Sequence, residues 1–263
     1  MELGICSWFG FKYSYGERIQ LIKDAGFQSV MMWWGEESRE ENAPREIRPK
    51  IIRKHGLKIE NMHFIFAGID AIWGDSPDGE NLLDKYLFYI DDCKAHEIPT
   101  AVMHVTGGDN PPPYGQIGLD RFKRLVERAE KNGITIALEN VWTPEYLDYL
   151  FANIESDKLK FCYDSGHENC FTPGTDCLAK YGNKLAALHL HDNDGTGDQH
   201  RLPFSGTVNW ERKMKKLKEL TYKGTLSLEV DAQYSNVINQ YTADEFLHEA
   251  KNRASKLAEL FEP

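Results

Sequence analysis

Several short apolar runs in this sequence each end in a histidine, an aspartate or a glutamate. Apolar runs of this kind predict strands that are buried on both faces, as parallel strands are. In a closed barrel, the carboxyl ends of all such strands meet on one face. The residues that end the runs are His63, His104, Glu139, Asp164, His189 and Glu229. Gathered on one face, these groups would repel each other or be costly to desolvate unless a divalent cation compensated them.

The sequence predicts eight strands that alternate with helices. Segments between the strands carry apolar residues at helical spacing, and four of the helices end in the phrases KDAG, RKHG, EKNG and TYKG. In each phrase a basic residue complements the helix dipole and glycine is expected to take the left-handed cap. The predicted strands are residues 2–6, 28–34, 58–64, 100–105, 134–139, 159–164, 186–191 and 225–230.

This alternation predicts one α/β domain, a single (β/α)8 TIM barrel spanning residues 1–263, because eight repeats in this length are typical of that fold. No linker rich in proline, glycine or serine divides the chain. A doubly wound open sheet is the second possibility, but no G-x-G-x-x-G follows the first predicted strand.

The composition of the chain bears on its cellular compartment and on the partners it can bind. No apolar run approaches the roughly 18 residues of a membrane span, and the amino terminus has no signal-peptide pattern. The five cysteines contain no C-x-x-C pair, which favours reduced thiols in a cytoplasmic protein. The formal net charge of −10 disfavours nucleic acid and anionic membranes as partners.

The segment that follows the seventh strand is unusually rich in possible ligands. Asp198 and His200 are two residues apart, so an extended chain would place both on one side, as a bidentate grip on a metal requires. His191 is expected to point away from His189, and a structural role and a ligand role remain equally open for it. Asp192 and Asp194 are interpreted as turn-forming residues.

Simpler explanations exist for single residues. One carboxylate at a strand end can cap the next helix, and a network of ion pairs can imitate a metal site. A metal site is favoured because several histidines share this position. Five of them fall at or just past strand ends: His63, His104, His167, His189 and His200. Aromatic residues near strand ends could line the mouth and stack on a sugar, namely Trp8, Trp33, Trp34 and Trp142.

The segments ALEN, CYDSGH, LHLHD, DQH and LEV, in this order, resemble the xylose-isomerase-like TIM-barrel superfamily over nearly the whole chain. That group includes sugar isomerases and epimerases and the endonuclease IV family. The resemblance places the metal tetrad of the epimerases on Glu139, Asp164, His189 and Glu229. It also makes His167 a residue that contacts substrate.

The three-zinc pattern of the endonuclease IV family is also filled. The resemblance implies one zinc at His63, His104 and Glu139, a second at Glu139, Asp164, His189 and Glu229, and a third at His167, Asp198 and His200. The loops depart from that family. The segment after the second strand, residues 35–41, is crowded with glutamate, whereas a DNA-facing loop should carry Arg and Lys.

The sequence therefore predicts a metal-dependent isomerase or epimerase of a small sugar or polyol. A metal would stabilise the enediolate while Glu139 and Glu229 remove and return the proton. His167, Arg201, Trp8, Trp34 and Trp142 are the predicted substrate contacts. The expected cofactor is zinc, one to three ions per chain, with manganese as the alternative. A zinc phosphodiester hydrolase of the endonuclease IV kind and a non-catalytic metal- or sugar-binding barrel remain as alternatives.

Overall fold

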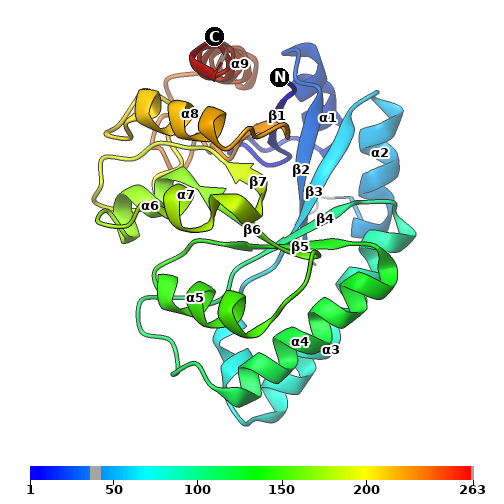
Figure 1. Ribbon diagram of the computed structural model, residues 1–263. Coiled ribbons are helices and arrows are strands. Elements are labelled where there is room, and N and C mark those ends of the chain that lie inside the picture. The colour runs from blue at the N-terminus through cyan, green and yellow to red at the C-terminus, as the bar shows by residue number, and fades with distance from the viewer. Residues whose placement is uncertain (36–42, 262–263) are drawn as a thin grey trace.

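The computed structural model describes residues 1–35 and 43–261, which form a barrel of eight parallel strands surrounded by helices (Figure 1). Neighbouring strands follow one another in the order β7-β6-β5-β4-β3-β2-β1-β8. A parallel bridge between Leu190 and Leu228 joins the two ends of this sheet. The strands are β1 Leu3–Cys6, β2 Ser29–Trp34, β3 Lys58–Phe64, β4 Thr100–Met103, β5 Thr135–Glu139, β6 Leu159–Asp164, β7 Leu185–His189 and β8 Leu226–Leu228. The predicted TIM barrel is confirmed and the open sheet is excluded.

The strands differ from the prediction chiefly at their carboxyl ends. β4 ends at Met103 and β8 at Leu228, so His104 and Glu229 lie one residue past their strands. β7 ends at His189 rather than at residue 191. The acidic loop predicted after the second strand falls largely on residues 36–42, outside the described residues.

The helices cover the outside of the barrel, with α9 beside α8 and α1 where the chain returns to its first strand (Figure 1). Within the described residues, none of the helices is long and apolar enough to cross a membrane. The α-helices are α1 Tyr15–Asp24, α2 Arg48–Lys54, α3 Pro77–Ala95, α4 Gln116–Asn132, α5 Pro144–Asn153, α6 Ser165–Phe171, α7 Cys177–Tyr181, α8 Trp210–Glu219 and α9 Ala243–Phe261. The short 3-10 helices are η1 Arg45–Ile47, η2 Ile69–Trp73 and η3 Gly182–Lys184.

Three of the four predicted glycine caps are present. Gly26, Gly56 and Gly133 have φ angles of 89°, 74° and 75°, which lie in the left-handed region. The fourth prediction is wrong, because after α8 the left-handed residue is Thr221, at φ 52°, and not Gly224. Glycine at position 224 instead lies against the side chain of Tyr222, whose hydroxyl oxygen a Cβ would meet at 2.2 Å.

Small side chains fill the barrel directly below the ligands. Residues two apart in a strand share a face, so each ligand has an inward-facing residue one layer beneath it. Val102, Ala137, Cys162 and Ala187 occupy this layer and form a buried cluster separate from the main core. The large apolar side chains pack instead between the strands and the helices.

Two β-bulges interrupt the ladder near the amino-terminal ends of the strands. Between β2 and β3, Ile59 pairs with Val30 and Asn61 with Met31, which leaves Glu60 without a partner. Between β6 and β7, Ala186 is left over in the same way. A bulge re-aims the side chain of the extra residue, and both extra residues are at the bottom of the barrel.

Candidate metal centre

Glu139, the last residue of β5, lies at the centre of the carboxyl-terminal face and is fully buried. Its Oε2 is 3.1 Å from Nε2 of His63 and 3.5 Å from Nε2 of His104. Its Oε1 is 3.2 Å from Nδ1 of His189 and 3.3 Å from Nδ1 of His167. One carboxylate thus faces four imidazoles that come from separate strand ends.

Glu229 extends the cluster toward β8. Its Oε2 is 3.1 Å from Nδ1 of His189, the atom that also faces Glu139. The two glutamates therefore flank one imidazole. Glu229 is the more open of the pair, because its side chain is 14% exposed while that of Glu139 is 1% exposed.

The second part of the cluster surrounds Asp164 and Asp198. His191 Nε2 is 3.1 Å from Asp164 Oδ1 and 3.6 Å from Asp198 Oδ1. Asp198 Oδ2 is 3.1 Å from Nε2 of His200 and 3.4 Å from Nε2 of His167. His167 contacts Glu139 as well, so it connects this part with the first.

Asp198 and His200 lie on a hairpin that folds back over the mouth after β7. The backbones of Asp192 and Arg201 exchange two hydrogen bonds, of 2.8 and 2.9 Å, at the base of the hairpin. The hairpin is fixed to the barrel by Asp192, a buried side chain whose carboxylate accepts from Trp210 Nε1 at 2.9 Å and from the Val208 amide at 3.1 Å. Asp194 closes its tip through Thr196, Gln199 and Arg201.

His191 is placed differently from the prediction. Residues two apart in an extended chain share a face, so His189 and His191 both point into the barrel mouth, while Leu190 points to the core. The His191 ring is fully buried and stacks on His200 with 4.2 Å between centroids. Gly166 makes room for it, since a Cβ there would lie 1.9 Å from the ring. The expectation that His191 points away from His189 is wrong.

Backbone carbonyls orient three of the imidazoles. The Nδ1 atoms of His63, His167 and His200 lie 2.7, 3.0 and 2.8 Å from the carbonyl oxygens of Phe64, Asn140 and Glu229. With Nδ1 donating to the carbonyl, each ring keeps Nε2 for the cluster, which is how metal-binding histidines are commonly held.

Asn140 also fixes the relative position of β5 and β6. Its side chain exchanges two hydrogen bonds of 2.8 Å with the backbone of Asp164. Asn140 therefore positions Asp164 through its side chain and His167 through its carbonyl. Asn140 is not among the residues predicted from the sequence, although it directly follows Glu139.

The ionisable side chains of the cluster shift one another's pKa values. Burial would raise the pKa of Glu139, but the imidazoles of His189 and His104 hold it well below its usual range. Burial opposes a charge on His200, yet Asp198 and Glu229 raise its pKa to about 10. For His104, burial prevails and lowers the pKa. The carboxylate of Glu139 is therefore ionised at neutral pH, which suits cation binding.

The residues present fit a metal ion. Several buried donor atoms have no hydrogen bond among the described residues, including both ring nitrogens of His189, Oε1 of Glu139 and Oδ1 of Asp198. Unpaired buried polar atoms of this kind are costly, and a bound ion would satisfy them. Sets of three donor atoms within 4.8 Å of one another include His63/His104/Glu139, His63/His189/Glu229 and His191/Asp198/His200. Imidazole nitrogens with carboxylate oxygens are a donor set that zinc prefers.

Aromatic rings surround this cluster, but only some are the predicted ones. Trp33 stacks on His63 at 4.8 Å between centroids, and Phe66 stacks on His104 at 4.3 Å. The ring centroid of Trp142 lies 4.4 Å from that of Phe171 and 6.4 Å from that of His167. Phe66 was not predicted, because it lies two residues past the end of β3 in a loop without a recognisable motif.

Three predicted substrate contacts have polar partners outside the cluster of ligands. Trp34 is fully buried and donates from Nε1 to Asp92 of α3 at 2.9 Å, so the prediction that it lines the mouth is wrong. Strand alternation sends Trp33 inward and Trp34 outward. The Arg201 guanidinium pairs with Asp194 at 2.8 Å, and Trp8 donates to Asp231 at 2.7 Å.

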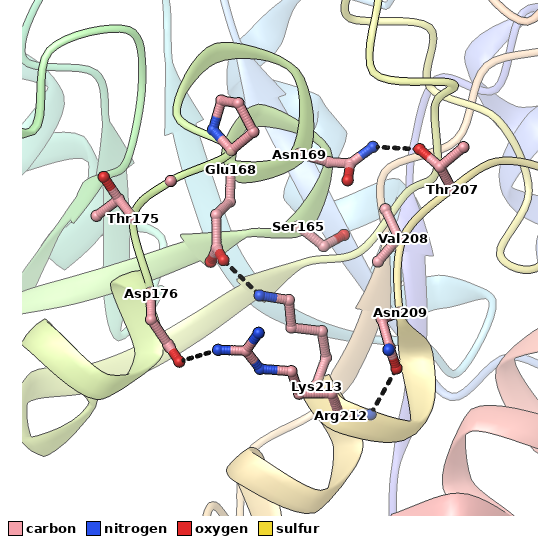
Figure 2. A pocket seen from close by; sticks show the side chains of 12 residues that line it. Ser165, Glu168, Asn169, Thr175, Asp176, Thr207, Val208, Asn209, Arg212 and Lys213 are labelled. Carbon is pink, nitrogen blue, oxygen red and sulfur yellow. Dashed lines mark hydrogen bonds and ion pairs between the residues drawn. The ribbon is translucent and has the colours of Figure 1, made fainter.

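A polar hollow of about 220 Å³ lies behind α6, which carries His167 (Figure 2). Its charges are paired: Glu168 with Lys213, and Asp176 with Arg212 at 2.8 Å. Asn169 bonds Thr207 across it at 2.9 Å. These contacts attach α6 to the start of α8, and so hold His167 against the hairpin.

Residues 19–254 match the family described as xylose isomerase-like TIM barrel. The chain belongs to this family. Uncharacterized protein y4fM of Sinorhizobium fredii is 25% identical over 249 residues, covering 80% of this chain and 79% of the relative. Solved structures of similar fold include a D-psicose 3-epimerase of Clostridium cellulolyticum H10 with D-tagatose (TM-score 0.78, 12% identity, 100% of both chains). Another is the IolI protein with a bound zinc atom (TM-score 0.77, 17% identity, 99% and 98% of the chains).

This xylose isomerase-like TIM barrel thus brings all nine predicted ligands to one face. The structure adds His191 to them as a tenth side chain, because its Nε2 faces Asp164 and Asp198 and it belongs to the donor sets Asp164/His167/His191 and His191/Asp198/His200 of the described residues. The signal that could have found it is its spacing, because it lies two residues past His189 on the same face.

Proposed function

We propose that the protein is a metal-dependent isomerase or epimerase of a small sugar or polyol. The observation that supports this most directly is the pair of carboxylates, Glu139 and Glu229, on either side of His189. They come from β5 and from the end of β8, so they approach the mouth from different parts of the barrel. A reaction that removes a proton from carbon and returns it needs two such groups.

Each carboxylate has a distinct task in this proposal. Both have pKa values held below the usual range, against the effect of burial, by His189 among other neighbours, so both are ready to accept a proton. Glu229, the more open of the two, takes the proton from the carbon next to the carbonyl. Glu139 first takes up a proton from the facing imidazolium of His167, whose pKa is raised well above its usual value, against the effect of burial, by Asp164 and Asp198, and then delivers that proton to the substrate carbon. Glu229 releases the proton it has taken to solvent, from which His167 is protonated again. His167 is placed to hold a substrate hydroxyl, since it contacts both Glu139 and Asp198.

A divalent cation, when bound, would supply the polarisation of the carbonyl that makes the adjacent C–H acidic. Glu139, Asp164, His189 and Glu229 would hold it, with zinc the better match for the nitrogen-rich donor set and manganese the alternative. Trp33, Phe66 and Trp142 then provide apolar walls against which the C–H face of a sugar could stack.

The experiment is proton exchange at carbon. Protein loaded with zinc or manganese is incubated in D2O with a panel of ketoses, aldoses and polyols, and deuterium at the carbon next to the carbonyl is followed by NMR. Incorporation with at least one sugar, lost in Glu229→Gln, is the expected result. Absence of exchange over the whole panel with fully loaded protein would contradict the proposal.

A second function is supported by the other half of the cluster. His191, Asp198 and His200 form a donor set of their own, which a single-metal epimerase does not need. Several zinc ions could together activate a hydroxide against a phosphodiester. Duplex DNA with abasic sites is the discriminating substrate. Efficient nicking at physiological salt, without sugar exchange, would favour this hydrolase over the epimerase.

A further inference from the structure

The opposite end of the barrel has a cavity of its own, of about 240 Å³. It is lined by the first residues of β3 and β7 and by the loop that leads into β8, including Lys58, Glu60, Asn61, Ala186 and Thr225. Ala187, which also lines it, lies in the layer directly beneath His189. The cavity therefore reaches into the barrel to within one layer of the metal ligands.

Both β-bulges of the sheet open onto this cavity. Their extra residues, Glu60 and Ala186, are among its lining residues. A bulge turns a side chain away from the direction that regular alternation would give it. Here the bulge in β3 allows Glu60 and Asn61, which are neighbours in the chain, to line the same space.

Glu60 is a partly buried carboxylate, and its hydrogen-bond partners among the described residues are neutral hydroxyl groups. The Ser227 hydroxyl donates to its Oε1. Burial raises its pKa to about 7, even though Ser227 and Thr225 hydrogen-bond to it. The nearest basic side chain on the cavity wall, Lys58, forms an ion pair with Glu2. A desolvated carboxylate in this position requires a proton or a cation.

Further oxygens around Glu60 lack partners. Asn61 is 2% exposed, and its Oδ1 has no hydrogen bond among the described residues. The same holds for the hydroxyl of Ser29, which is fully buried. Gly4 leaves a space between them, since a Cβ there would lie 2.7 Å from Ser29 Oγ and 3.2 Å from Glu60 Oε1. A proton on Glu60 would satisfy one oxygen, whereas a coordinated cation would satisfy several.

We propose that the amino-terminal mouth of the barrel binds a small monovalent cation, coordinated by the side-chain oxygens of Glu60 and Asn61. One carboxylate that forms no ion pair with the described residues balances one positive charge. The lining has no imidazole or thiolate, so it does not suit the transition metals of the opposite face. An alkali-metal ion and an ammonium group share this chemistry, and the experiment separates them.

The direct test is crystallographic and uses the wild-type protein with its divalent metal bound. Crystals are grown in choline chloride and soaked in rubidium chloride, and anomalous scattering is recorded. An anomalous peak in the cavity beside Glu60 is the expected result. An empty cavity at high rubidium concentration would overturn an alkali-metal site.

The solution test compares cations at equal ionic strength. Potassium, rubidium or methylammonium chloride in place of choline chloride should raise the Tm by about 4 °C if the site is nearly saturated. Glu60→Gln should abolish the rise, while Glu211→Gln, which removes an exposed carboxylate from α8, should retain it. A rise with methylammonium alone would identify an ammonium ligand. A Tm that depends on none of these cations, together with an empty cavity in the soaked crystals, would show that Glu60 is balanced by a proton and would refute the proposal.

Discussion

The ligands of the carboxyl-terminal face are held in two different ways. His63 and Glu139 lie in the last two residues of their strands, and His104 and Glu229 follow theirs by one residue, so the barrel ladder fixes the positions of all four. Asp198 and His200 lie on a hairpin that is attached to the barrel through Asp192 and its backbone bridge to Arg201. The strand-borne ligands are as rigid as the fold, whereas the hairpin-borne ligands depend on a few contacts.

The largest effect is expected at the strand-borne centre. Glu139→Gln keeps the shape but removes the charge that faces four imidazoles and one of the two proposed proton-transfer groups. Activity should fall by about 10³-fold, since a positioned acid or base contributes 10²–10⁴, and metal binding should weaken. Steady-state kinetics and elemental analysis measure both. Full turnover by this variant would show that the centre is misplaced.

Matched truncations separate the two groups of ligands. His104→Ala and His200→Ala should each lower the metal content without unfolding the barrel, as judged by elemental analysis and circular dichroism. We expect His200→Ala to remove only hairpin-bound metal and to leave sugar exchange within about tenfold of wild type, because the proposed epimerase chemistry uses the strand-borne set. An unchanged metal content with a raised KM would instead make these residues hydrogen-bonding partners of the sugar.

Proton release on metal binding should differ between His200 of the hairpin and His104 of the strand ends. In the metal-free protein the pKa of His200 is raised to about 10, so its pairing with Asp198 contributes stability fully below about pH 6.5 and loses it as the pH rises through about 10. A metal at the hairpin must displace that proton, whereas the pKa of His104 is lowered and demands none at neutral pH. Calorimetry at pH 7.5 in buffers of different ionisation enthalpy should show about one proton fewer released by His200→Ala. Equal proton release by the wild-type protein and by His200→Ala would contradict this prediction.

Loosening the attachment should affect only the hairpin. Asp192→Asn keeps the size of the side chain but removes the charge-assisted bonds to Trp210 and Val208, each worth about 1.5–3 kcal/mol. The metal content of the hairpin should fall while that of the strand-borne set persists. Asn209→Ala, which removes the cap of α8 nearby, serves as the control. Loss of all metal from Asp192→Asn would mean that the two groups are not independent.

The smallest effect is expected at the tip. Arg201→Ala breaks a partly exposed ion pair with Asp194, and such pairs contribute about 0–1 kcal/mol. Thermal unfolding should therefore change little, and so should metal content. A large rise in KM with unchanged stability would instead support Arg201 as the substrate contact that the sequence analysis predicted.

The strand-borne part could be predicted from sequence far better than the rest. Apolar runs and strand-end positions locate Glu139, Asp164 and His189 directly, because the barrel brings all carboxyl ends together. Trp34 was assigned to the wrong face, since alternation fixes which residues share a face but not which face is inward when both are buried. His191 was misjudged by a wrong use of the same alternation.

Other features depend on contacts that no local pattern reports. The position of Phe66 over His104 and the buried anchoring of Asp192 by Trp210 arise from residues far apart in sequence. The bulge that turns Glu60 toward the bottom of the barrel could not be predicted either, because a strand with one extra residue has the same sequence pattern as an ordinary strand.

The hairpin between Asp192 and Arg201 makes the chemistry of this face modular. The chain enters and leaves it at two residues that are already paired, so a shorter loop could join the same two points without disturbing any of the eight strands. Such an exchange would remove two ligands in one step and leave Glu139, His189 and Glu229 in place. In the proposed metal-dependent enzyme, the number of bound metal ions could therefore be changed by replacing this one loop while the barrel stays as it is.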